Sequence, residues 1–548
     1  MGGKRKLKKS RDSWKGKAVG RGGEARRLRK ENRRLAQERD RYKAIVAQMK
    51  AERERMNVVP ACQTKEDLVY LTLKLYRDAR LGFRAVSRVL DVLSEVLGFD
   101  VKACAQTIIN WVARLAIVRV RFYVPCASDT NGPDPFSNGT IWLVDVSIAL
   151  SSAKILTIIA INVRHHAEHD GAPTLLDYRC VAVAVAESWT GEIEADFMER
   201  VIEVTGRPSA MLMDGGTDLG KSNRDLAAKE ILIPVVEDVS HFVANLLKHE
   251  YEDHASFDPF MSACGKASKK LKQTVLAFLA PPKISMKARF MNIHRLVQWA
   301  DKILKHSPQG RAAKGSILEK LRGALNEIPE HKLFITNFLR DAVPPMECMK
   351  LLKNKGLSHE TWAQCQKLVE AIPATSSIRT GFIEWGERMM LVANKLGVDN
   401  IGMPVSTDGL ECLFSVGKRH GSGEIKDANR IALRLPVECG PITHEDAKRV
   451  LGVTVAEQNE IIGGLPSLLR QRCRILPNPG ALSELILDPG KHLELIPQPK
   501  TREKSPLKSP NIIDISVVCR NEPCVRFGLE ESAANMGNSV ARGAPMAG

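Results

Sequence analysis

The sequence of 548 residues lacks several features that would assign it to a common class of protein. Its 12 cysteines include no Cys-x-x-Cys pair, which argues against a zinc ribbon or a disulfide framework and favours reduced thiols. The most apolar stretch, Ile141–Ile161, is interrupted by Asp145 and Lys154, whereas a membrane span needs about 20 apolar residues. The N-terminal segment has no apolar core of the kind that a signal peptide carries. We therefore expect a soluble, cytoplasmic protein with no membrane partner.

Acidic side chains are scarce in the first part of the chain. Residues 1–56 contain 21 Lys and Arg but only 7 Asp and Glu, so they carry +14 of the formal net charge of +18. Such a basic arm indicates a polyanionic partner, most often nucleic acid. One seam of a heptad repeat is also present, formed by Leu28, Leu35, Tyr42, Met49 and Met56. Because the second seam is largely polar, the pattern is compatible with a single basic helix, a disordered arm or a short parallel dimer.

Residues 61–127 are expected to form three helices, over Lys65–Arg77, Phe83–Leu97 and Lys102–Ile117. Their apolar side chains recur at helical spacing. Three short helices in this order are typical of a helix-turn-helix domain, whose last helix enters the major groove of DNA. An ordinary helical bundle gives the same pattern, but the adjacent basic arm favours DNA binding. In the helix-turn-helix interpretation the outward-facing DNA contacts are Gln106, Thr107 and Asn110.

At about residue 139 the pattern changes from helical to strand-like. The expected order is three strands, a helix, a strand, a short helix and a strand, over Ile141–Ala149, Ile155–Val163, Cys180–Glu187, Glu192–Thr205, Ser209–Met213, Asn223–Lys229 and Ile231–Val236. Three antiparallel strands followed by two α/β units give the order of elements in the ribonuclease-H-like fold.

The rest of the chain is expected to be mostly helical, and its end is rich in Pro, Ser and Gly, which indicates disorder. The predicted fold class is therefore multidomain α and α/β. The expected regions are a basic helical arm (1–60), a helix-turn-helix domain (61–127), a ribonuclease-H-like core (139–250 and 398–440) interrupted by an all-α insertion (251–397), a helical region (441–499) and a disordered tail (500–548).

Three carboxylates stand out by their positions. Asp145 interrupts the apolar run IWLVDVSIAL, where a buried carboxylate is costly unless it is paired or binds a metal ion. Asp214 ends a predicted strand, at the edge where α/β sheets bind ligands. Glu411 leads a predicted helix. Taken singly, these residues have ordinary interpretations, namely a solvent-facing strand Asp, a turn Asp and a surface Glu. Together they form a set of oxygen ligands for Mg²⁺ or Mn²⁺, and two such ions can support in-line phosphoryl transfer.

The order of these motifs resembles bacterial insertion-sequence transposases of the DDE class, in the group whose ribonuclease-H-like core is split by a helical insertion. The matching segments are IWLVDVS around Asp145, MLMDGGTDL around Asp214 and STDGLECLFSVGKRHG around Glu411. VEDVSHFVANLLKHE and LAFLAPPKISMKARFMNIHRLVQWADKIL are also similar to this group, and the likeness spans about residues 10–440. The neighbourhood of Cys412 and the long tail depart from the pattern.

The resemblance implies that Asp145, Asp214 and Glu411 are the catalytic, metal-binding triad and that two Mg²⁺ or Mn²⁺ ions are the cofactors. The implied reaction cuts DNA at the element ends and transfers the freed 3′-hydroxyl to target DNA. Basic residues near the DNA backbone would be Lys418, Arg419 and His420. The implied partners are double-stranded DNA and at least one further copy of the chain, because two ends must be paired, and the expected location is the nucleoid.

Two other functions compete with this one. Residues Gly215–Ser222 read GGTDLGKS, which matches the phosphate-binding P-loop, and Val235–Asp238 could form the acidic strand of an NTPase. An NTPase core, however, needs further parallel strands where this chain becomes helical, and it leaves Asp145 without a role. The third possibility is a dimeric DNA-binding protein with an inactive core. His241 is either a core or capping histidine or a group near the metal ions.

Overall fold

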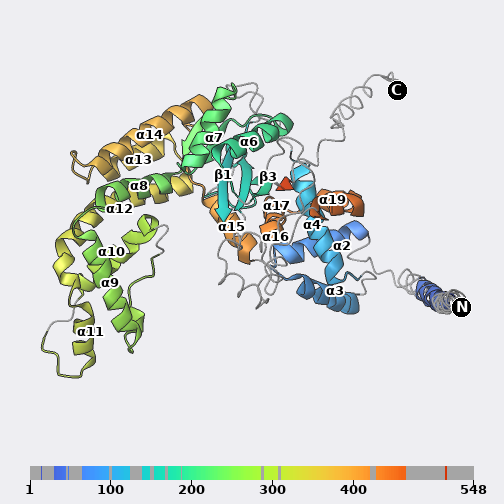
Figure 1. The fold of residues 1–548 in the computed structure, drawn as a ribbon, viewed down its shortest axis with the longest axis horizontal. Coiled ribbons are helices and arrows are strands. Elements are labelled where there is room, and N and C mark those ends of the chain that lie inside the picture. Colours follow the sequence, from blue (N-terminus) through green and yellow to red (C-terminus); the bar gives the residue numbers. More distant parts are fainter. Residues whose placement is uncertain are drawn as a thin grey trace, which may run out of the picture.

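The computed structural model describes the helices, the sheet and part of the basic arm (Figure 1). The described residues are 14, 30–44, 47, 64–97, 102–121, 123, 139–148, 154–166, 171–186, 188–284, 289–306, 310–419, 428–463 and 513–514. Within the arm, residues 30–44 are helical. Of the heptad seam, Leu35 and Tyr42 fall in these ranges, and both are more than half exposed.

A mixed sheet lies between the other parts of the molecule (Figure 1). Its strands are β1 (Ile141–Ile148), β2 (Lys154–Ile161), β3 (Arg179–Ala186), β4 (Ala210–Met213), β5 (Val235–Glu237) and β6 (Ile513–Asp514). They are hydrogen-bonded in the order β5-β4-β1-β2-β3-β6. β1, β2 and β3 are antiparallel neighbours, whereas β4 and β5 run parallel to β1. The apolar runs seen in the sequence become strands because both faces of this sheet are covered.

Two helices connect the parallel part of the sheet. α6 (Gly191–Thr205) leads from β3 to β4, and α7 (Thr217–Ala228) leads from β4 to β5. The predicted β1 to β4 and α6 lie within two residues of the observed bounds. α7 begins six residues earlier than expected, because the extended Gly216 caps it directly after β4. β5 begins later than expected, since Glu230 is left-handed and Pro234 has no N–H to offer a neighbouring strand.

Each face of the sheet has its own apolar core. α6 and α7 pack on the face that contains Trp142. The opposite face contains Leu143 and Leu212 and packs against α8 (Val239–Tyr251) and α15 (Asp408–Arg419). Figure 1 shows α6 and α7 above the sheet and α15 below it. Because side chains alternate along a strand, the odd-numbered residues of β1 point toward α15.

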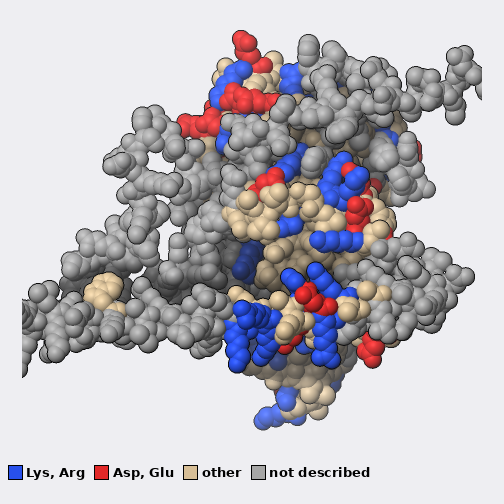
Figure 2. Space-filling model, turned by 90° about the vertical axis from the view of Figure 1, so that its right-hand side faces the viewer, with Lys and Arg blue, Asp and Glu red and all other residues tan. Residues whose placement is uncertain are grey.

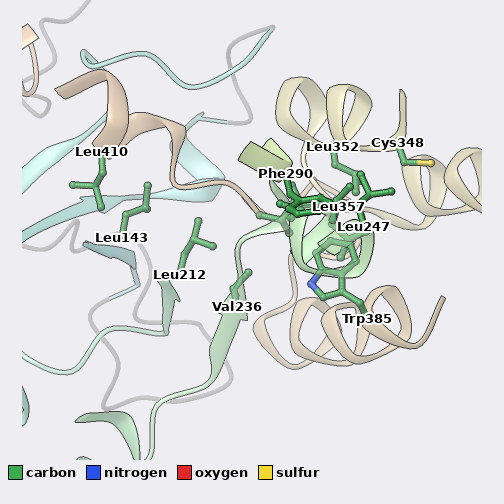
Figure 3. Packing of buried hydrophobic residues seen from close by; sticks show 14 of the residues in the cluster. Leu143, Leu212, Val236, Leu247, Phe290, Cys348, Leu352, Leu357, Trp385 and Leu410 are labelled. Carbon is green, nitrogen blue, oxygen red and sulfur yellow. The ribbon is translucent and has the colours of Figure 1, made fainter. Parts of the chain in front are cut away.

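The segment between β5 and α15 is helical. After α8 come α9 (Phe257–Lys272), η2 (Ala277–Leu279), α10 (Arg289–Lys305), α11 (Ile317–Leu325), η3 (Ile328–His331), α12 (Lys332–Lys355), α13 (His359–Val369) and α14 (Ser377–Leu396). The described part of residues 251–397 contains no strand, and its one β-bridge pairs Leu357 with Met403. Figure 3 shows the apolar core running from Leu143 of the sheet to Trp385 of these helices. The helical segment between β5 and α15 thus shares its main core with the sheet.

The N-terminal helices pack against segments that follow α15. The N-terminal helices are α2 (Lys65–Arg77), α3 (Phe83–Leu97) and α4 (Ala105–Arg121), and the segments packed on them are α17 (Leu435–Glu438), α18 (His444–Gly452) and α19 (Val455–Gly463). The short α16 (Ala428–Ala432) packs instead on β2 and β3. Arg119 joins the two segments, since its guanidinium donates to the Gly440 and Pro441 carbonyls and pairs with Asp446 at 3.2 Å. α18 and α19 therefore pack on the N-terminal helices, a contact that the sequence did not indicate. α4 also starts and ends later than the predicted Lys102–Ile117.

Two short features complete the described structure. α5 (Val163–His166) follows β2, and β6 extends the sheet by pairing Ile513 with Val185 of β3. β6 falls inside the tail that was expected to be disordered, and the rest of residues 500–548 lies outside the described residues. Within the described ranges, no helix has both the length and the apolar character needed to cross a bilayer.

Candidate active site

Asp145 and Asp214 occupy adjoining positions on two parallel strands. In the register of β1 and β4, Val144 lies opposite Met213, so each aspartate directly follows a paired residue. Both aspartates have the same side-chain alternation as Leu143, whose face of the sheet packs against α15. The two carboxylates therefore point to the same face, at the end of β4 where a parallel sheet opens to ligands.

Asp145 carries a carboxyl group that is unusually hard to ionise. Burial raises its pKa to about 6, and repulsion by the carboxylates of Asp214 and Glu411 acts in the same direction. The N–H of Val146, which donates to Asp145 Oδ1 at 2.6 Å, and the nearby His241 oppose this rise. The ionised form of Asp145 is thus destabilised by its surroundings, and a bound cation would relieve that repulsion.

Asp214 folds back over the glycines that follow β4. The N–H of Gly216 donates to Asp214 Oδ1 at 3.2 Å. A Cβ atom on Gly216 would lie 2.9 Å from that same oxygen, whereas a Cβ on Gly215 would meet nothing within 4 Å. Burial raises the pKa of Asp214, with His241 opposing and Asp238 adding to the shift. The glycine at 216 therefore leaves room for the carboxylate.

Glu411 reaches the same site from α15, which packs on β1. At the start of this helix, the Glu411 N–H donates to the Thr407 carbonyl at 3.2 Å. Partial burial raises the pKa of Glu411, and repulsion from Asp408 and Asp238 adds to it. Repulsion from Glu411 also raises the pKa of Asp145, whereas Glu411 does not contribute to the raised pKa of Asp214. Asp145 is therefore the carboxylate that is affected by both of the others.

Asp238 fixes the start of α15 next to the sheet. Its buried Oδ2 accepts two hydrogen bonds from Thr407, one from the backbone N–H at 2.6 Å and one from the hydroxyl at 3.0 Å. Its Oδ1 caps α8 by accepting the His241 N–H at 2.8 Å. The Asp238 N–H donates to the Met213 carbonyl, one residue before Asp214. The carboxylate of Asp238 thus joins α8 to α15, and its backbone N–H joins them to β4. From the sequence, Asp238 had a role only in the NTPase interpretation. An Asp three residues before His241 at the start of a predicted helix is, however, a signal of a helix cap.

His241 lies among the acidic residues and lowers the pKa of Asp145, Asp214 and Glu411. Its Nδ1 has no hydrogen-bond partner and lies 3.9 Å from Asp238 Oδ1. The sequence left His241 either as a capping histidine or as a group near the metal ions. His241 lies at the capped start of α8, where Asp238 accepts its N–H, and its ring is beside the acidic residues, so both interpretations stay open.

The basic residues at the end of α15 differ from one another. Lys418 points into the site, where its Nζ donates to Ser147 Oγ at 2.7 Å, and burial lowers its pKa while Asp145 raises it. Arg419 is exposed and bonds to Ser415 Oγ on the preceding turn. His420 lies outside the described residues. Among the described basic residues of this group, Lys418 is therefore the one beside the carboxylates.

A further acidic residue, Glu194, was missed in the sequence. It lies in the first turn of α6, is almost fully buried, and its Oε2 has no hydrogen-bond partner. Burial raises its pKa to about 7, and repulsion from Asp218, Asp214 and Asp145 adds to the shift. A Glu in the first turn of a helix usually offsets the helix dipole, so nothing in the local pattern distinguished Glu194.

Among the described residues, no three His, Cys, Asp or Glu side chains form a group that could hold a metal ion. Asp145 and Asp214 nevertheless fit a hard divalent cation as a pair, because they are adjoining carboxylates whose ionised forms are disfavoured by burial. Glu411 adds to the raised pKa of Asp145 but does not complete a three-residue cluster with the pair.

The segment that matches a P-loop has the wrong conformation for binding phosphate. α7 begins at Thr217, so Lys221 and Ser222 belong to the second turn of a helix. Lys221 Nζ pairs with Glu192 at 3.0 Å, and the buried Ser222 hydroxyl donates to the Leu219 carbonyl at 2.8 Å. The segment therefore does not form a loop whose N–H groups surround a phosphate, and the geometry argues against an NTPase site.

The three predicted DNA contacts on α4 differ in how far their side chains are exposed. Gln106 is exposed, and Thr107 is half-buried beside Cys104. Asn110 was expected to face outward, but its Oδ1 accepts a hydrogen bond from Gln458 of α19 at 3.1 Å, so its side chain is partly occupied within the protein. The docking of α19 on α4, which the sequence did not indicate, is the reason.

Basic side chains are prominent on this side of the molecule. Figure 2 shows Lys and Arg gathered over the lower half of the face that includes the N-terminal helices. On these helices and the segment joining them, Arg84, Arg88 and Lys102 are exposed. Together with the basic arm, they give this side a positive charge.

No protein-family model matches the chain, and a search of curated proteins finds none with significant similarity to it.

Proposed function

We propose that the protein is a DDE transposase of an insertion sequence, which cuts DNA at element ends and transfers the freed strand to target DNA. The single observation that carries the proposal is the adjoining position of Asp145 and Asp214 on parallel strands, on the face that Glu411 approaches. Two carboxylates at the end of a parallel strand pair are suited to divalent-cation chemistry on phosphates.

The arrangement of the sheet supports the same proposal. The strand order β3-β2-β1-β4-β5, with the first three antiparallel and the last two parallel to β1, is the order expected for a ribonuclease-H-like core. The helical segment between β5 and α15 accounts for most of the 197 positions from Asp214 to Glu411. We infer that it is an insertion within that core.

In the proposed mechanism, ionised Asp145 and Asp214 would hold Mg²⁺ or Mn²⁺, with Glu411 as a further oxygen ligand. Bound divalent cations supply Lewis-acid stabilisation of the attacking and leaving oxygens in phosphoryl transfer. Asp238 keeps Glu411 near the pair by holding Thr407. Lys418 presents an ammonium group beside Asp145, where it can balance the charge of the phosphate. The DNA is attracted by the basic arm and the exposed basic residues of the N-terminal helices, of which Gln106 and Thr107 are candidate contacts.

The joining of two ends requires at least two copies of the chain, so we propose a homodimer or larger assembly acting in the nucleoid. A strand-transfer assay tests the function. Pre-cut DNA that carries the sequences flanking the gene, mixed with a supercoiled plasmid, is expected to be joined to it in Mg²⁺ or Mn²⁺ and not in EDTA. Specific DNA binding without any joining or cleavage would instead identify a DNA-binding regulator.

A further inference from the structure

The longest stretch without acidic residues lies in the helical insertion, away from the proposed active site. Residues 259–300 contain eight Lys and Arg and no Asp or Glu. In Figure 1, α9 and α11 lie on the opposite side of the sheet from α2, α3 and α4. A field of a single sign over one part of a surface attracts polyanions.

The lysines of α9 divide into two groups. Lys270 bonds to the Gly323 carbonyl of α11, and Lys266 pairs with Glu327, which lies between α11 and η3. Lys269 and Lys272 are exposed and lie on the other flank of the helix, away from its buried stripe. Lys283, after the η2 turn, is also exposed. Lys266 and Lys270 therefore hold the insertion together, whereas the other three cations are available to a ligand.

Two exposed apolar side chains lie between Lys272 and Lys283 in the sequence. Val275 is 76% exposed and Phe278 is 79% exposed. The turn that carries them is anchored, because Leu276 is buried and the Trp299 Nε1–H donates to the Leu279 carbonyl at 3.0 Å. Phe278 is thus presented to solvent from a fixed turn.

We infer that this surface, which we call the insertion tip (Lys269, Lys272, Lys283, Val275 and Phe278), binds DNA. The lysines would contact phosphates, and Phe278 would pack against bases or insert at a base step. The choice of DNA over other polyanions rests on the proposed function. The tip would then be a second DNA contact, on the other side of the sheet from the N-terminal helices.

The test compares two variants of the full chain that lose the same charge. One replaces the tip cations, K269Q/K272Q/K283Q, and the control replaces three exposed lysines on other helices of the insertion, K355Q/K367Q/K395Q. Binding of a long labelled duplex is measured by fluorescence anisotropy between about 50 and 200 mM salt. For the tip variant, the steepness of the plot of log affinity against log salt concentration is expected to decrease by about 2 to 3. Each lost phosphate contact removes about 0.9 from the magnitude of this slope. The control is expected to keep the wild-type slope.

Phe278→Ala separates stacking from charge. It is expected to weaken binding about fivefold or more at every salt concentration while leaving the slope unchanged. Equal slopes for the tip and control variants would overturn the inference, as would binding of the tip to anionic lipid vesicles and not to DNA. The proposed function fails separately: DNA binding that depends on the tip, without metal-dependent cleavage, would keep this inference and remove the transposase.

Discussion

Thr407 gives both its backbone N–H and its hydroxyl to one buried oxygen of Asp238, 169 residues earlier in the chain. This contact joins the end of β5 to the start of α15 across the whole helical insertion. Because Glu411 lies one turn after Thr407, the position of the third carboxylate depends on it. The geometry of the site is therefore held by a residue outside the proposed triad.

The substitution Asp238→Asn tests this dependence. An amide has one acceptor oxygen, so either Thr407 or the N–H of His241 would meet an NH₂ group instead. We expect a loss of about 1 to 3 kcal/mol in the free energy of unfolding, measured in urea. We also expect a fall in the cleavage rate constant with little change in DNA affinity. Thr407→Ser, which retains the hydroxyl, is the matched control and should remain near wild type, and a normal rate for Asp238→Asn would contradict the role.

Asp145 is expected to cost stability when no metal ion is bound. Its pKa is raised in the folded protein to about 6, so the folded state holds this proton to higher pH than the unfolded state does. The contribution of Asp145 to the free energy of unfolding therefore decreases as pH rises from about 4 to about 6. Asp145→Asn removes the charge and should stabilise the metal-free protein at pH 7 by up to about 3 kcal/mol.

Urea unfolding at pH 4 and pH 7 measures this effect, and the gain from Asp145→Asn should be much larger at pH 7. A gain of the same size at both pH values would show that the raised pKa is not its cause. Added Mg²⁺ should raise the melting temperature of the wild type and have little effect on Asp145→Asn.

The two glycines after β4 provide a further test. Gly216→Ala puts a methyl group against Asp214 Oδ1, whereas its backbone, with φ −62°, accepts alanine without strain. We expect at least a tenfold loss of cleavage, about 1.4 kcal/mol in the transition state, with a small change in melting temperature. The methyl group added by Gly215→Ala would have no atom within 4 Å, so this variant should retain activity. Similar rates for the two variants would mean that the Asp214 carboxylate does not depend on the space at Gly216.

The sequence predicted best what depends on local pattern. β1 and β4 were located from apolar runs, and their adjoining aspartates followed from the order of strands. α7 was predicted too short, because its first turns contain Gly220 and polar residues that favour loops in isolation. Contacts between distant segments were not predictable. The contact of Asp238 with Thr407 positions the helix that carries Glu411. The contact of Asn110 with Gln458, 348 residues apart, occupies one of the predicted DNA-binding side chains.

We propose that Asp145, Asp214 and Glu411 act together on DNA. The most direct measurement is single-turnover cleavage of labelled DNA that carries the flanking element ends, in Mg²⁺ or Mn²⁺. Asp145→Ala, Asp214→Ala and Glu411→Ala should each abolish cleavage while DNA binding persists, and Glu384→Ala, an exposed carboxylate on α14, should cut at the wild-type rate. Full cleavage by any one of the three variants would contradict the triad.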